Sequence, residues 1–294
     1  MTTTYGRIIY TNMPTAKSQE QDRLVTLLLS GLAGWGKSSF AMCAPQPHAV
    51  LCVDKPICAQ PAPGTPGYDP ELTFWKSYPP PDTDLTNAKA KKPRNVADEI
   101  YKDLQTIKNA LRAKQPTFDM DGEQWPLPRT LIVEGADFIA KHVENWVLAV
   151  NDKTDMTDWE DRFTGWRLRL SKLNDIYDLL TYLPQANLCN IVVTTGLDEE
   201  SKMQKNERGK MELTKTGFVD PELGGKMSIE GPRKFANSFL CTVAAGKWWV
   251  VTKPVGAYSK FRGIRSGQFG MDDQIDVTVD AKHPINIWDK VFGS

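Results

Sequence analysis

The stretch LLLSGLAGWGKSSFAM, residues 27–42, decides how this 294-residue chain builds its fold. Residues 24–30, LVTLLLS, are almost wholly apolar, which is typical of a strand covered on both faces of a parallel sheet. A glycine-rich turn follows at once. The segment KSSFAMCA then predicts a short helix that ends near Pro45, because proline cannot continue the helical hydrogen-bond ladder. The sequence therefore predicts a strand, a tight turn and a helix in direct succession.

The turn matches the pattern G-x-x-x-x-G-K-[ST] at Gly31, Gly36, Lys37 and Ser38. Glycines let the backbone turn so that amide groups point at phosphate oxygens, and the following helix presents its positive end to them. Lys37 is predicted to reach the terminal phosphates, and Ser38 to hold magnesium. We therefore expect ATP and Mg²⁺ as cofactors. The other nucleotide contacts predicted in the turn are Gly34, Trp35 and Ser39.

Three further apolar segments predict neighbouring strands, at residues 48–54, 128–137 and 190–195. Between these strands, apolar residues recur at the spacing of a helix, at residues 95–115 and 159–180. Alternating strands and helices predict an α/β fold with a mostly parallel central sheet flanked by helices. The buried stripe predicted for the second of these helices is Trp159, Phe163, Trp166, Leu170, Leu173 and Leu180.

Polar groups end each of these later strands, and such ends converge on a ligand crevice. Glu134 is the expected magnesium-binding acid, with Asp137 as the alternative, and Asp54 is the candidate that orients water for hydrolysis. With the loop lysine, Glu134 and Asp54 form the predicted catalytic set. Glu134 could instead be a solvated acid ending its strand, and Asp54 a turn residue. Thr194 and Thr195 could sense the terminal phosphate or simply cap their strand.

The segments around this core predict less regular structure. Residues 56–81 contain eight prolines and are expected to be an extended surface excursion without regular structure. Residues 56–127 as a whole are interpreted as an insertion. A mobile loop is expected in the polar, lysine-rich run from Glu199 to Lys215. Residues 238–264 predict two or three antiparallel strands with turns at Gly246 and Gly256.

The two ends of the chain are expected to lie outside the main domain, which is predicted to span residues 24–265. Residues 1–23 are interpreted as an N-terminal arm and residues 266–294 as a C-terminal tail that ends in an anchoring apolar cluster at 285–292.

Composition excludes several other classes of protein. Lysine plus arginine equals aspartate plus glutamate at 36 each, so no global charge attracts nucleic acid or membrane. Five scattered cysteines without a C-x-x-C pair favour a reducing, cytoplasmic compartment, and three histidines far apart give no zinc spacing. The sequence has no apolar run of 18 residues, so we expect no membrane partner.

The order of these parts resembles that of the RecA-like nucleotide-binding ATPases of bacteriophages, the group that includes single-strand-annealing recombinases. The resemblance rests on the glycine-rich turn, VLCVD, LIVEGAD, NIVVTT and the late GKWWVVTKPVGAYSKFRG, and it covers residues 24 to 265 with gaps. It implies an ATPase that acts on single-stranded DNA in recombination or replication. The family usually has aspartate at Glu134, and RecA proper has a glutamate where this chain has Lys55 and Pro56. These departures imply slow hydrolysis.

The resemblance also implies partners. RecA-like ATPases form rings or filaments in which basic side chains reach the nucleotide of the next subunit, and Lys253, Lys260 and Arg262 are the matching candidates. Each of the three could instead be an ordinary outward-facing strand residue. We therefore expect a homo-oligomer. The loop at residues 199–215 lies where such proteins contact single-stranded DNA, and its candidate contacts are Lys202, Lys205, Arg208, Lys210 and Lys215. Four glutamates in the same run dilute this charge, so the alternative is an ordinary solvated surface loop.

Two other functional classes fit the glycine-rich turn. A small-molecule kinase would carry an arginine-rich lid and an acceptor pocket. A nucleotide-gated structural or defence protein would bind ATP as a signal without turning it over. Trp248 and Trp249 could stack on bases, but a tryptophan in a strand is more often part of the core.

Overall fold

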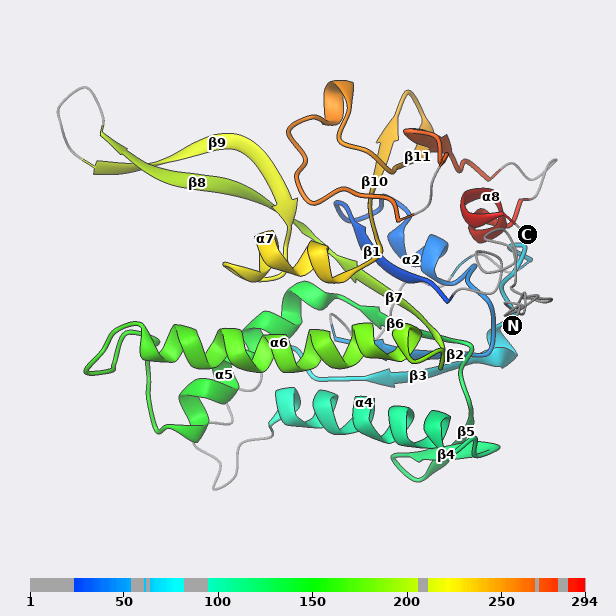
Figure 1. The fold of residues 1–294 in the computed structure, drawn as a ribbon, viewed down its shortest axis with the longest axis horizontal. Coiled ribbons are helices and arrows are strands. Elements are labelled where there is room, and N and C mark those ends of the chain that lie inside the picture. The colour runs from blue at the N-terminus through cyan, green and yellow to red at the C-terminus, as the bar shows by residue number, and fades with distance from the viewer. Residues whose placement is uncertain are drawn as a thin grey trace, which may run out of the picture.

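An eight-stranded sheet forms the centre of the structure (Figure 1), a computed structural model that describes residues 24–53, 61, 64–81, 95–205, 211–267, 270–279 and 285–293. The strand order is β12-β11-β10-β1-β7-β6-β2-β3. The six strands from β10 to β3 run parallel, and β11 and β12 add antiparallel to the β10 edge. The strands are β1 (Thr26–Ser30), β2 (His48–Cys52), β3 (Thr73–Ser77), β6 (Thr130–Glu134), β7 (Asn190–Thr195), β10 (Asn237–Ala244), β11 (Lys247–Val251) and β12 (Gln274–Asp276).

Helices cover both faces of this sheet. They are α2 (Lys37–Ala41), α4 (Val96–Arg112), α5 (Ala136–Val150), α6 (Thr164–Gln185), α7 (Met227–Glu230) and α8 (Ile287–Phe292), with shorter 3-10 turns η1 (Pro70–Leu72), η3 (Gly231–Lys234) and η4 (Gly256–Tyr258). Two smaller hairpins, β4 (Thr117–Met120) with β5 (Glu123–Pro126) and β8 (Leu197–Lys205) with β9 (Met211–Pro221), complete the fold.

Alternating side chains of β1 divide the core into two layers. Leu28 packs in the layer covered by α4, α5 and α6, while Leu27 and Leu29 pack in the layer with α2 and α8. All three side chains are fully buried. This two-sided burial explains why the strand has a continuous apolar sequence, and it confirms the predicted α/β fold with a mostly parallel, helix-flanked sheet.

Several predicted elements are confirmed. Helix α4 begins after Asn95, whose side chain accepts a hydrogen bond from the Asp98 amide, and its apolar stripe is buried. Strands β10 and β11 form the predicted antiparallel pair around Gly246. The apolar cluster near the end of the chain forms α8 and packs on α2 through Phe40 and Trp288, with ring centroids 6.2 Å apart. The expectation that residues 266–294 form a tail outside the main domain is wrong, because β12 joins the central sheet and α8 packs in its core layer. The N-terminal arm, residues 1–23, lies outside the described residues.

The proline-rich segment is more regular than its composition predicts. Strand β3 lies within it and pairs in parallel with β2, from Thr73 beside His48 to Ser77 beside Cys52. Five residues free of proline suffice for an edge strand, because only one side of it needs the backbone ladder. The β4–β5 hairpin, inside the same predicted insertion, was also not anticipated.

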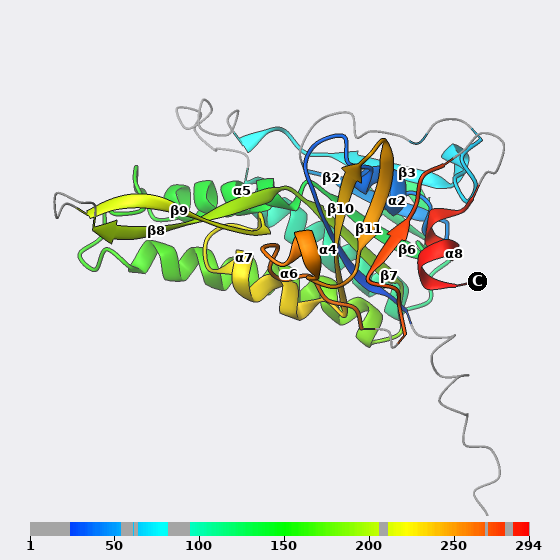
Figure 2. The same cartoon turned by 90° about the horizontal axis from the view of Figure 1, so that it is seen from above.

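The expected mobile loop at residues 199–215 is wrong. Strands β8 and β9 pair there as a long antiparallel hairpin that projects from the body in Figure 1 and overlaps α5 and α6 in the view of Figure 2, with residues 206–210 outside the described part. Most of its described side chains are exposed or half-buried, so the sequence lacks the apolar alternation that normally marks a strand. Pairing depends instead on backbone hydrogen bonds and on cross-strand contacts such as Glu199 with Lys215, at 2.8 Å.

Two smaller expectations also fail. Helix α6 begins at Thr164, and Phe163 and Trp166 are 53% and 44% exposed, so they do not belong to its buried stripe. Cys52 is disulfide-bonded, whereas Cys43, Cys189 and Cys241 are free and buried. The scattered cysteine spacing, which favoured a reducing compartment, gave no sign of this disulfide, because pairing depends on which cysteines the fold brings together.

Candidate functional site

The glycine-rich loop, residues 31–38, connects the carboxyl end of β1 to α2 at the centre of the sheet. Gly31 lies so close to β10 that a Cβ atom on it would be 2.7 Å from the carbonyl oxygen of Cys241. Gly36 has φ +83°, a left-handed conformation that L side chains rarely adopt. The two motif glycines are therefore required by backbone geometry, and the loop turns directly into α2.

Lys37 lies folded back over this loop. Its ammonium group donates hydrogen bonds to the carbonyl oxygens of Gly31, at 2.8 Å, and Leu32, at 3.0 Å. A cation at this point complements phosphate oxygens that face the same backbone turn. The structure thus brings the predicted lysine to the mouth of the predicted cradle.

Ser38 and Glu134 meet across the sheet. The hydroxyl of Ser38 donates a hydrogen bond to Oε1 of Glu134 over 2.5 Å, although the two residues come from α2 and the end of β6. Glu134 is only 8% exposed. A serine hydroxyl beside a buried carboxylate offers the oxygen ligands that Mg²⁺ prefers. Across the described chain, no group of three or more His, Cys, Asp or Glu side chains could hold a metal ion.

The end of β7 lies between β1 and β6 and is hydrogen-bonded to the residue that follows each of them. Thr194 accepts a hydrogen bond from the Gly135 amide at 3.1 Å, directly after Glu134. The Gly31 amide donates to the carbonyl oxygen of Thr195 at 3.3 Å, while the Thr195 hydroxyl donates to the carbonyl oxygen of Glu222 at 2.5 Å. The two threonines therefore connect the glycine-rich loop, the residue after Glu134 and the chain that follows the β8–β9 hairpin.

Other acids gather at this edge. Asp137 lies in the first turn of α5, and the carboxylate of Glu222 covers Gly196 so closely that a Cβ there would be 2.6 Å from Oε2. Burial, with Asp137 and Asp198 nearby, raises the pKa of Glu222 above its ordinary value. The sequence did not single out Glu222, because it lies far along the chain from the motif. Asp54, the predicted water-orienting acid, lies outside the described residues.

The remaining loop residues take different positions. Trp35 is half-buried and packs against the core layer that contains α2, and Ser39 lies half-buried in α2 itself. Trp35 therefore has a structural contact that accounts for its size, and its role as a nucleotide contact stays a prediction.

The three late basic candidates contact acids or backbone of other segments. Lys253 pairs with Asp273 at 2.6 Å, and Lys260 lies beside Gly217. Arg262 pairs with Asp220 and, at 3.1 Å, with Glu200. These contacts involve the base of the β8–β9 hairpin or the segment before β12. Their action on a neighbouring subunit's nucleotide stays a prediction.

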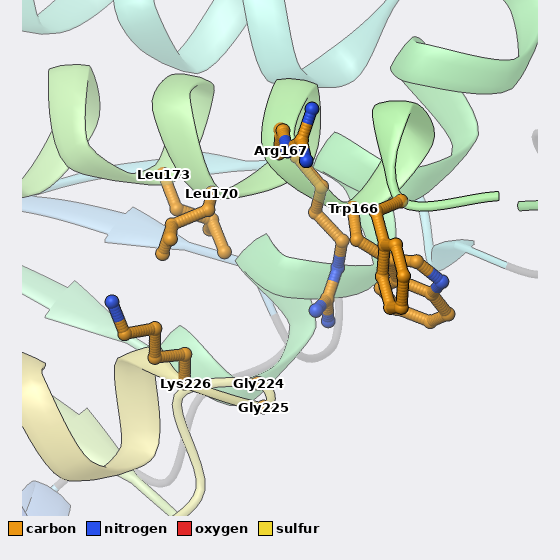
Figure 3. Close-up of a pocket in the computed structure, with 9 residues that line it drawn as sticks. Trp166, Arg167, Leu170, Leu173, Gly224, Gly225 and Lys226 are labelled. Carbon is orange, nitrogen blue, oxygen red and sulfur yellow. The ribbon is translucent and has the colours of Figure 1, made fainter. Parts of the chain in front are cut away.

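A pocket of about 360 Å³ opens between the first half of α6 and the turn that follows β9 (Figure 3). It is lined by Phe163, Trp166, Arg167, Arg169, Leu170, Leu173, Gly224, Gly225 and Lys226. In Figure 3, Leu170 and Leu173 extend from α6 toward Gly224 and Gly225. The guanidinium of Arg169 lies 5.5 Å from the ring of Trp166. The lining therefore combines aromatic rings, cations and an apolar floor, with no carboxylate among its residues.

Sequence reasoning missed this pocket because it treated Phe163 and Trp166 as core residues. The exposure of these two side chains marks the pocket, but it is a property of the folded structure and cannot be read from the spacing of apolar residues. The predicted DNA-contacting lysines on the hairpin are partly neutralised: Lys202 pairs with Glu200 at 3.4 Å, and Lys215 pairs with Glu199. The side chain of Lys205 and all of Arg208 and Lys210 lie outside the described part.

Comparison with known proteins gives no family assignment, since neither a protein-family model nor a curated protein matches this sequence. Among the described residues, no helix is both long enough and apolar enough to cross a membrane.

Proposed function

We propose that this chain is a RecA-like ATPase that binds ATP with Mg²⁺, hydrolyses it slowly, and acts on single-stranded DNA as a homo-oligomer. The hydrogen bond between Ser38 and Glu134 is the observation that carries the proposal. It joins the hydroxyl next to the loop lysine to a buried acid at the carboxyl edge of a parallel sheet, where ligands of such sheets bind. Ser38 and Glu134 would hold Mg²⁺, and Lys37 would bind the terminal phosphates.

The strand order brings the acid and the glycine-rich loop to one edge of the sheet. Strand β7 separates β1, which precedes the glycine-rich loop, from β6, which carries Glu134. A bound Mg²⁺ would polarise the phosphates and offset the charge that develops during transfer. The protein groups would position and neutralise, and Thr194, beside Glu134, could contact the terminal phosphate.

The pocket on α6 supports single-stranded nucleic acid as the partner. Exposed Trp166 and Phe163 offer faces on which bases can stack. Arg167 and Lys226 line the same pocket, and phosphates would replace the surface acids that pair with them, Asp161 and Glu230. The pocket begins two residues after Glu222, whose carbonyl oxygen holds the Thr195 hydroxyl. A strand bound there would therefore lie one short segment from the nucleotide site.

The test is ATP hydrolysis with and without single-stranded DNA at low salt, with Lys37→Ala as the inactive control. We expect slow basal turnover, stimulation by DNA, and DNA binding that weakens as salt rises, because phosphate contacts release counterions. Absence of both stimulation and salt-sensitive binding would exclude the DNA role. Phosphate transfer to a small-molecule acceptor, with no turnover on DNA, would favour the kinase. Mass measurement with ATP tests the oligomer, which a purely monomeric protein would contradict.

A further inference from the structure

Trp248, in the β10–β11 hairpin, packs against the glycine-rich loop. Its indole Nε1 donates to the carbonyl oxygen of Gly34 at 3.5 Å, and a Cβ atom on Gly36 would lie only 3.1 Å from its Cδ1. The side chain nevertheless remains 41% exposed. Trp248 is not part of either core layer, so packing in the core does not explain why it contacts Gly34 and Gly36, the two glycines of this loop with positive φ.

The backbone of Trp248 is fixed on two sides. Strand β11 lies between β10 and β12, with Trp248 opposite Val243. Its amide donates to Oγ1 of Thr278 at 2.9 Å, and its carbonyl oxygen accepts from the Val277 amide at 2.9 Å. The backbone that carries the indole is thus held beside the loop by hydrogen bonds on both sides.

The loop itself has reason to need such support. Gly34 and Gly36 have φ +79° and +83°, and glycine loses more conformational entropy on ordering than any other residue. A loop that must be ordered when phosphate binds weakens affinity, whereas a loop already held in its bound shape does not. A ring packed on Gly36 restricts the turn that aims the following amide groups.

We propose that Trp248 is a positioning residue that holds the glycine-rich loop in its phosphate-binding conformation. This inference rests on the proposed nucleotide function. Because Trp248 contacts Gly34 and Gly36, it acts on the phosphate-binding part of the site and not on the nucleobase.

The test compares two ligands, ATP and inorganic tripolyphosphate, which lacks a base and a sugar. Trp248→Ala is expected to weaken binding of both by the same factor, about tenfold, since the cost of ordering the loop is common to both. Trp248→Phe keeps an aromatic ring on Gly36 and should restore most of the affinity. Trp249→Ala is the matched control, because successive side chains of a strand point to opposite faces.

Hydrogen exchange in the ligand-free protein tests the same role without nucleotide. Amides of residues 31–41 should exchange faster in Trp248→Ala than in the wild type or in Trp249→Ala. Loss of ATP affinity with unchanged tripolyphosphate affinity would make Trp248 a base contact and overturn the proposal, as would unchanged affinity and unchanged exchange. If the wild type binds neither ligand, the proposed function fails, while the exchange rates still decide whether Trp248 holds the loop.

Discussion

Ser38 Oγ lies 2.5 Å from Oε1 of Glu134, although 96 residues separate them in the chain. The contact spans three strands, since β7 lies between β1, which precedes Ser38, and β6, which ends at Glu134. Thr194 of β7 holds the Gly135 amide beside the pair at 3.1 Å. A hydroxyl and a buried carboxylate are therefore placed together by the sheet as a whole, and not by any local segment.

Replacement of Glu134 by glutamine should remove the Mg²⁺ dependence of ATP binding. The amide still accepts a hydrogen bond from Ser38 but lacks the negative charge that a divalent ion requires. We expect the affinity for ATP in Mg²⁺ to fall at least about tenfold, with little change in EDTA. Calorimetric titration in the two buffers measures this. Glu230→Gln, which alters a surface acid paired with Lys226, is the control. Equal Mg²⁺-dependent affinity in Glu134→Gln and wild type would contradict the role.

Trp166→Ala should weaken binding of single-stranded DNA. Stacking of a base on an aromatic side chain contributes about 1–3 kcal/mol, and the 44% exposure of Trp166 means that its loss should affect stability little. Fluorescence anisotropy with a labelled oligonucleotide measures the change. Tyr182→Ala serves as control, since Tyr182 is also exposed on α6 but lies outside the pocket. DNA affinity that is the same in Trp166→Ala and wild type would show that the pocket does not stack bases.

Arg167→Ala should change the salt dependence of DNA binding. The side chain lines the pocket, is 73% exposed and pairs with the exposed Asp161 at 3.0 Å, so its guanidinium would exchange this acid for a phosphate. Loss of one phosphate contact should reduce the slope of log affinity against log salt by about 1. Titrations at several salt concentrations measure the slope. An unchanged slope would exclude Arg167 from phosphate contact.

Lys76→Met should destabilise the fold. The ammonium group is buried and lies 2.8 Å from Asp103 and 2.9 Å from Asp121. Burial lowers the pKa of Lys76, but its hydrogen bonds to these acids outweigh burial and raise the pKa above the ordinary value. Its stabilisation is therefore complete at neutral pH and is lost only as pH rises through the raised pKa.

Without Lys76 these carboxylates would repel one another, so we expect the free energy of unfolding to fall by about 3 kcal/mol. Urea denaturation measures it. Lys234→Met, which removes the ion pair with the exposed Asp178, should cost less than about 1 kcal/mol. Similar losses in the two variants would contradict the buried role of Lys76.

His48→Gln should make stability less dependent on acid pH. Burial lowers the pKa of His48 from 6.5 to about 4, and its Nε2 lies 2.9 Å from the carbonyl oxygen of Ala44. The unfolded chain therefore binds a proton that the folded chain resists, so stability falls as pH drops from 6.5 to 4, by about 3 kcal/mol in full. Urea unfolding at pH 7, 5.5 and about 4 measures this. Parallel pH profiles in the two proteins would refute the assignment.

The sequence predicted the glycine-rich loop, the strands β1, β2, β6 and β7, the β10–β11 pair and helix α4, because each has its own local pattern. It did not predict β3, the β4–β5 hairpin or the β8–β9 hairpin. These elements are short or exposed on both faces, so apolar periodicity does not mark them. Phe163 and Trp166 fit a helical stripe by spacing, but α6 begins after Phe163 and both side chains are exposed.

The sequence by itself determined that an apolar strand, a glycine turn and a lysine–serine pair follow one another in residues 24–38, because that pattern is local. Only the tertiary structure decided that Glu134 is the acid beside Ser38, that Glu222 holds Thr195, and that Trp248 covers Gly36. These contacts join segments far apart in the chain. Sheet order and strand register set them, and both depend on how the two core layers pack.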